Sequence, residues 1–142
     1  MNARDRILTA LEHREPDRVP IYEGTIDNMA IAKEFSGKTS IQGLRKAMRA
    51  ISRIPGWRSL YSGFMKSGFV NIGNVSPQEL AMETVDQITT YTRRLIREVA
   101  PGGGFILASG HSINPFVKKE NYLAMLDIAK RHGTYPIQDV PI

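Results

Sequence analysis

A histidine flanked by small polar residues is the strongest candidate for chemistry in this sequence. His111 follows an apolar run at residues 105–109 and stands between Gly110 and Ser112. An imidazole ionises near neutral pH, so it can transfer a proton or donate a hydrogen bond to a ligand. The alternative is a loop histidine that only bonds a neighbouring carbonyl, and position alone does not separate the two.

Further polar side chains stand at two places where apolar runs end, at residues 73–76 and 109–115. If both runs are parallel strands, their carboxyl ends share one edge of a sheet, which is where α/β proteins bind ligands. Glycine at both places lets a ligand approach the backbone closely. The sequence therefore predicts a substrate-binding set at this edge: Asn74, Ser76, Ser109, Gly110, Ser112 and Asn114.

Several other classes of site find no support. The glycines at 102–104 follow a predicted helix and open a strand, which is the reverse of a phosphate loop. His13 and His132 stand at helix ends and are read as surface residues. The chain has no cysteine, no HExxH or GxSxG motif and no metal-ligand cluster. We therefore expect neither a metal nor a cofactor.

Strands and helices alternate where these side chains must be positioned. Strands are expected at residues 17–23, 69–75 and 104–109, and helices at 3–13, 27–35, after Ser76, after Thr84 and at 120–132. Serine or threonine followed three residues later by Glu79 or Gln87 is a capping-box pattern. Strand, helix and strand in succession predict parallel pairing through a right-handed crossover.

Charge is concentrated in one segment. The formal net charge is +5, yet residues 35–77 contain no acidic residue and carry seven basic ones. We read residues 38–67 as a basic helical segment within a single domain spanning 1–142. A solvated surface is the simplest reading, and nucleic-acid binding rests on charge alone. The charged N-terminus and the lack of a long apolar run predict a cytoplasmic protein without a membrane span.

Three segments resemble the uroporphyrinogen decarboxylase superfamily. The run APGGGFILASGHSINPFVKKENYLAMLDIAKRHGTYPI is similar to its C-terminal strand, loop and helix. RDRILTALEHREPDRVPIYE is similar to its first helix and strand, and residues 69–75 with the following helix are similar to its seventh unit. The resemblance implies an α/β fold of the (β/α)₈ TIM-barrel type. Here we expect a partial barrel of three parallel strands equivalent to strands 7, 8 and 1, with 104–109 in the centre.

The same resemblance implies an activity. His111 falls where the decarboxylases carry an active-site histidine, which implies a carboxy-lyase acting on a carboxylated tetrapyrrole in porphyrin biosynthesis, without a cofactor. We expect a shortened member that lacks the central strands, so activity of this chain alone is in question. Exposed strand edges then favour a homo-oligomer or a complementing chain.

Two alternatives stay open beside decarboxylation. One is a relative of the corrinoid-dependent methyltransferases, which would use zinc and a corrinoid partner to methylate a thiol. In those relatives a cysteine ligand stands at the position of His111, and this chain has none. The other is a non-catalytic remnant or split half that binds a partner chain.

Overall fold

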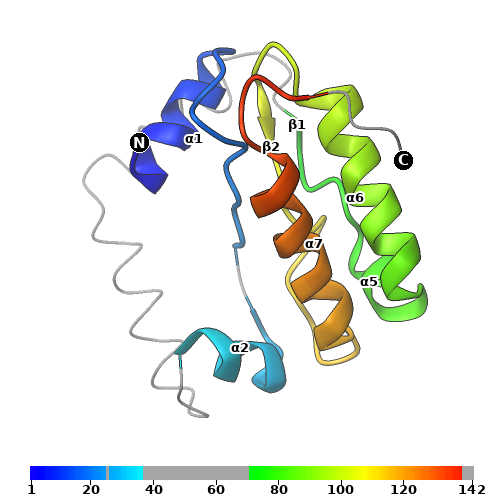
Figure 1. The fold of residues 1–142 in the computed structure, drawn as a ribbon. Helices are drawn as coiled ribbons and strands as arrows, with labels where there is room; N and C mark the ends of the chain where they lie inside the picture. The colour runs from blue at the N-terminus through cyan, green and yellow to red at the C-terminus, as the bar shows by residue number, and fades with distance from the viewer. Residues whose placement is uncertain (25, 37–70, 139–142) are drawn as a thin grey trace.

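The structure is a computed structural model that describes residues 1–24, 26–36 and 71–138. The named elements are α1 (Ala3–Leu11), α2 (Met29–Ser36), β1 (Asn71–Ile72), α5 (Pro77–Met82), α6 (Val85–Val99), β2 (Phe105–Ile106) and α7 (Lys119–His132). Figure 1 shows α6 and α7 side by side, with α1 apart from them. α2 packs against α7, where Phe35 contacts Tyr122 edge to face and Glu34 pairs with Lys119. Among the described residues, no helix is both long and apolar enough to cross a membrane.

Parallel pairing joins three segments that are far apart in the sequence. β1 pairs with β2 in parallel register, with Ile72 opposite Ile106, and a further parallel bridge joins Val75 to Ser109. On the other side of the segment that contains β2, Ile21 forms a parallel bridge with Leu107. The residues around Leu107 therefore lie between the N-terminal segment and the segment that contains β1. Pro20 fits here because its carbonyl accepts from the Leu107 N–H and no donor is required of it.

Side chains of these paired segments alternate between two faces, as extended backbone requires. Ile21, Val75 and Leu107 pack in the main core with residues of α6 and α7. Tyr22, Ile72 and Ile106 face the other way and pack against Ala10 and Leu11 of α1. One face of the paired segments is thus covered by α6 and α7, and α1 covers part of the opposite face.

The helix starts follow the patterns seen in the sequence. Ser76 with Glu79 caps α5, Thr84 with Gln87 caps α6, and both form complete capping boxes. The apolar side chains of α6 differ in burial. Val85 is 40% exposed, because it stands in the first turn, whereas Ile96 is buried.

The first helix is shorter than expected. α1 ends at Leu11 rather than at residue 13, and His13 adopts a left-handed backbone conformation, with φ of 54°. The turn at residues 102–104 lies against residues 13 and 14, which follow α1. A Cβ on Gly103 would lie 2.5 Å from the backbone carbon of Arg14, so only glycine fits there. Gly103 therefore lies close against the backbone that follows α1.

The basic helical segment expected at residues 38–67 lies outside the described residues, as do residues 69 and 70 of the strand expected at 69–75.

Candidate functional site

His111 opens onto a cavity at the carboxyl ends of the paired segments. The cavity has a volume of about 440 Å³ and is lined by Tyr22, Gly24, Ile72, Ala108, Ser109, Gly110, His111 and Ser112. That volume is in the range of small-molecule sites. The His111 side chain is exposed, and its Nδ1 lies 2.9 Å from Ser112 Oγ. Nε2 makes no hydrogen bond with a described residue, so it is the ring nitrogen that a ligand would meet.

Ser109 connects this loop to the N-terminal segment. Its N–H donates to Glu23 Oε1 at 2.9 Å, and its Oγ lies 2.6 Å from Glu23 Oε2. The same Oγ is in hydrogen-bond contact with the backbone oxygen of His111. Residues 86 positions apart are thus joined directly at the base of the histidine loop.

Two glycines bring the strand ends together. Gly73 has φ of 81°, and a Cβ there would lie 3.2 Å from Gly110 Cα and 3.3 Å from the Ser109 oxygen. The Gly110 N–H donates to the carbonyl of Val75 at 2.9 Å. Neither glycine can gain a side chain without the other loop moving. The two polar segments expected to meet at one edge do meet, through backbone.

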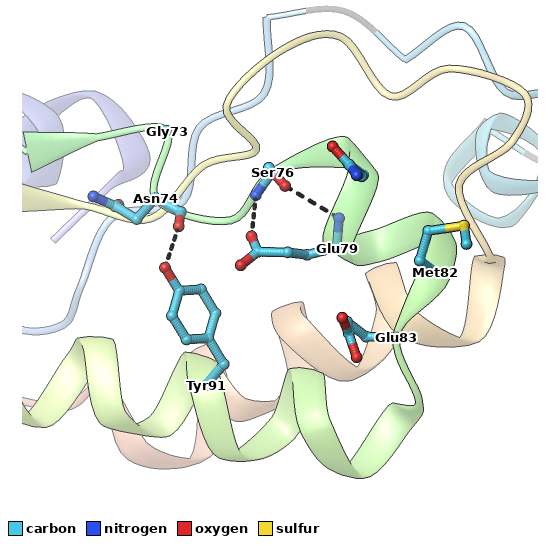
Figure 2. A pocket seen from close by; sticks show the side chains of 8 residues that line it. Gly73, Asn74, Ser76, Glu79, Met82, Glu83 and Tyr91 are labelled. Carbon is cyan, nitrogen blue, oxygen red and sulfur yellow. Dashed lines mark hydrogen bonds between the residues drawn. The ribbon is translucent and has the colours of Figure 1, made fainter.

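Asn74 and Ser76 line a different cavity, of about 410 Å³, shown in Figure 2. The Ser76 hydroxyl accepts from the Glu79 N–H, so the α5 cap occupies it. The Tyr91 hydroxyl donates to the Asn74 carbonyl at 3.0 Å. Asn74 Oδ1 is buried and has no hydrogen-bond partner among the described residues. Of these two candidates, Asn74 therefore keeps an unused polar atom.

Asn114 lines neither cavity and serves its own loop. Its Oδ1 accepts from the Phe116 N–H, and its carbonyl accepts from Asn28 Nδ2. Asn28 is buried and also donates to the Val117 carbonyl while it accepts from the first turn of α2. The amides of residues 28 and 114 thus hold the loop that follows His111.

Glu23 and Tyr22 were not among the candidates from the sequence. Tyr22 lines the His111 cavity. Glu23 does not line this cavity, but its carboxyl group is hydrogen-bonded to Ser109, which does. The available signal was their position at the carboxyl end of an expected strand, where Glu23 is a lone carboxylate in an apolar run. Tyr22 and Glu23 reach the His111 loop because their segment pairs with the segment that contains β2. A local sequence pattern does not reveal this pairing.

Burial changes the acidity of both residues. It raises the pKa of the Glu23 carboxyl above its ordinary value of 4.5, and the donations from Ser109 offset this only in part. The pKa of the Tyr22 hydroxyl is also raised, first by burial and then by the charge of Glu23. Within the described residues, no group of three or more His, Cys, Asp or Glu side chains is arranged to hold a metal ion.

A known protein family matches the segment that contains these residues. The family described as Uroporphyrinogen decarboxylase (URO-D) matches residues 44–132, which is more than half of the chain. The chain belongs to the uroporphyrinogen decarboxylase family. The match takes in both strand ends, His111 and the other site candidates from the sequence. Tyr22 and Glu23 precede the part that matches this uroporphyrinogen decarboxylase family. Comparison with curated proteins and with solved structures found no match.

Proposed function

We propose that this chain is a carboxy-lyase that removes carbon dioxide from a carboxylated tetrapyrrole, with His111 as the catalytic residue. One observation carries the proposal. Within the part that matches the uroporphyrinogen decarboxylase family, His111 opens onto a cavity at the carboxyl ends of parallel segments. The role of His111 and the identity of the substrate are parts of this proposal.

The reaction consumes a proton, and a group in the site must deliver this proton to the substrate. A pyrrole that bears a carboxylated side chain takes up a proton on the ring, the bond to the carboxylate carbon breaks, and carbon dioxide leaves an exocyclic methylene. The methylene carbon then takes a proton, and the ring gives back the one that it took up. In the product, a C–H bond replaces the C–CO₂⁻ bond, so that one proton is consumed in total. Because Nδ1 of His111 faces Ser112, Nε2 is the atom that would donate this proton or bind the substrate carboxylate.

Charge favours the His111 cavity over the one at Asn74. Glu79 and Glu83 line the Asn74 cavity, and their carboxylates would repel a substrate that carries several carboxylates. The wall of the His111 cavity has no acidic side chain among the described residues. Its apolar members, Ile72, Ala108 and Tyr22, suit the flat face of a pyrrole ring.

The fold belongs to the same proposal. Parallel segments with α6 and α7 on one face, and a candidate site at their carboxyl ends, are features of a sector of a (β/α)₈ barrel, while α1 covers part of the other face. The pairings of Ile72 with Ile106 and of Ile21 with Leu107 support this assignment. The inner side of the barrel would be the face of Tyr22 and Ile72, onto which the His111 cavity opens.

The proposal is tested by following carbon dioxide release from uroporphyrinogen. We expect turnover by the wild-type chain and a loss of kcat/KM of about 100-fold or more in His111→Ala, which is the usual effect of removing a general acid. Lys130→Ala changes an exposed side chain in the last turn of α7 and is the control, with kcat/KM unchanged.

Two outcomes would contradict this function. Wild-type activity no greater than that of the blank would favour a non-catalytic chain that binds a partner or a second copy. Methylation of a thiol by a corrinoid protein in the presence of zinc would favour the methyltransferase alternative. No contact among the described residues favours either alternative.

A further inference from the structure

The Ser109 hydroxyl lies between two acceptor oxygens. Its Oγ is 2.6 Å from Glu23 Oε2 and is also in hydrogen-bond contact with the His111 backbone oxygen. Oxygens this close need a proton between them, and a serine hydroxyl supplies only one. An ionised Glu23 would leave one of the two pairs as a contact between lone pairs. The arrangement therefore needs one proton more than Ser109 provides.

Of the groups in contact, the Glu23 carboxyl is the one that can take this proton, because an amide carbonyl is not basic near neutral pH. We propose that Glu23 is a neutral acid that positions His111: its Oε2–H donates to Ser109 Oγ, whose own proton goes to the carbonyl of His111. Glu23 Oε1 still accepts from the Ser109 N–H. The inference rests on the proposed function only in taking His111 as the group that is positioned.

The surroundings of Glu23 favour the neutral form. It is on the face of the sheet that packs against the helices, and the ionisable groups that interact with it are Tyr22 beside it and Tyr122 of α7, which is 2% exposed. Burial raises the pKa of both hydroxyls, which keeps them uncharged. Among the described residues, no cation contributes to the pKa of Glu23. Burial raises that pKa without an opposing charge.

The hydrogen bonds of Glu23 and Ser109 fix the backbone of the histidine loop. Starting from Glu23, the chain of hydrogen bonds runs through Ser109 to the carbonyl of His111 and so fixes the backbone from which the imidazole projects. Glu23 is absent from the cavity wall, so it acts through the loop and not on the substrate. Loss of its proton would break one of these contacts and loosen the histidine loop.

The proton on Glu23 can be observed without any activity. In protein labelled with ¹³C at the glutamate carboxyl carbons, Glu23→Gln identifies the Glu23 resonance by its disappearance. We expect the Glu23 resonance to keep the chemical shift of a protonated carboxyl at neutral pH, in the direction in which burial moves its pKa. Glu98, whose pKa is lowered by Arg94, is the internal reference with the opposite shift. A Glu23 resonance with the chemical shift of a carboxylate at neutral pH would overturn the proposal.

Two substitutions separate positioning from simple packing. Glutamine can donate from Nε2 to Ser109 Oγ and accept from the Ser109 N–H, so Glu23→Gln is expected to keep kcat/KM close to the wild-type value. Glu23→Ala removes both bonds and is expected to lower kcat/KM by roughly 10- to 100-fold, the effect of a displaced catalytic group. Equal losses in the two variants would overturn the proposal.

The pH dependence of stability gives a further measurement. Because folding raises the pKa of Glu23, its stabilising contribution is present below pH 4.5 and is lost as pH rises through the folded-state pKa. The stability of Glu23→Gln relative to wild type should therefore increase with pH over that window. A difference that does not vary with pH would overturn the neutral acid. If wild type shows no decarboxylation, the proposed function fails, while the titration still decides the state of Glu23.

Discussion

At the scale of single residues, Gly73 and Gly110 determine how close the two strand ends come. Gly73 is in a left-handed conformation, and the position of a Cβ there is crowded by Gly110 Cα and the Ser109 oxygen. Backbone is the obstacle, so no side-chain rotation relieves the contact. The Ser109 carbonyl and Gly110 belong to the loop that carries His111. A change at residue 73 should therefore reach the histidine through backbone.

Gly73→Ala should reduce both stability and activity. A left-handed alanine costs about 1–2 kcal/mol wherever it occurs, and the contacts at 3.2 and 3.3 Å add to this. Gly102→Ala is the matched control, because Gly102 has φ of 83° and nothing within 4 Å of the added Cβ. Urea unfolding of both variants, together with kcat/KM, separates backbone strain from crowding. If Gly73→Ala and Gly102→Ala lost the same stability and the same kcat/KM, the contact between residue 73 and Gly110 would have no effect of its own.

The residues of the histidine loop could be predicted from the sequence, whereas the residues that contact this loop from other segments could not. Ser109, Gly110, His111 and Ser112 do line one cavity, because they are consecutive and follow a buried segment. Glu23 could not be found in this way, since its contact with Ser109 depends on a pairing between residues 86 positions apart. Asn114 instead binds within its own turn, where its Oδ1 accepts from the Phe116 N–H, and the contact that could not be predicted is the one from Asn28 Nδ2 to its carbonyl.

At the scale of elements, the two capping boxes are alike in pattern but differ in place. Ser76–Glu79 lies at the end of the segment that contains β1 and lines a cavity, whereas Thr84–Gln87 is exposed. Capping signals are local, which is why both helix starts could be predicted from four residues each. The end of α1 is at Leu11 rather than at residue 13, and residues 13 and 14 lie against the turn at 102–104, a contact distant in sequence.

Ser76→Ala and Thr84→Ala should each lower the free energy of unfolding by about 1 kcal/mol, the usual cost of losing an N-cap side chain. Denaturant unfolding measures both. If the Ser76 hydroxyl serves only as a cap, we expect the folded Ser76→Ala and Thr84→Ala proteins to have the same kcat/KM. A selective loss of kcat/KM in Ser76→Ala would instead make Ser76 a substrate ligand and move the site toward the Asn74 cavity.

At the scale of the whole molecule, the fold depends on contacts between the two ends of the described chain. Tyr22 N–H donates to the Leu107 carbonyl at 2.9 Å, and Leu107 N–H donates to the Pro20 carbonyl at 3.0 Å. The Arg18–Thr134 bridge and the bond from Val19 N–H to the Gly133 carbonyl extend this contact. Parallel order was predictable from the alternation of strands and helices. The N-terminal neighbour of Leu107 was predicted only through the resemblance to a closed barrel.

Hydrogen exchange can test this whole-molecule arrangement. The Tyr22 and Leu107 amides join segments whose side chains are buried on the helix-covered face, so neither bond can open unless the core separates. We expect both amides to exchange at the rate set by global unfolding, as slowly as the Gly110 amide bonded to Val75. The Arg6 amide, in the first turn of α1, should exchange much faster. If the Tyr22 amide exchanged as fast as that of Arg6 while Gly110 stayed protected, residues 18–23 would be only loosely attached, and neither Tyr22 nor Glu23 could shape the His111 cavity.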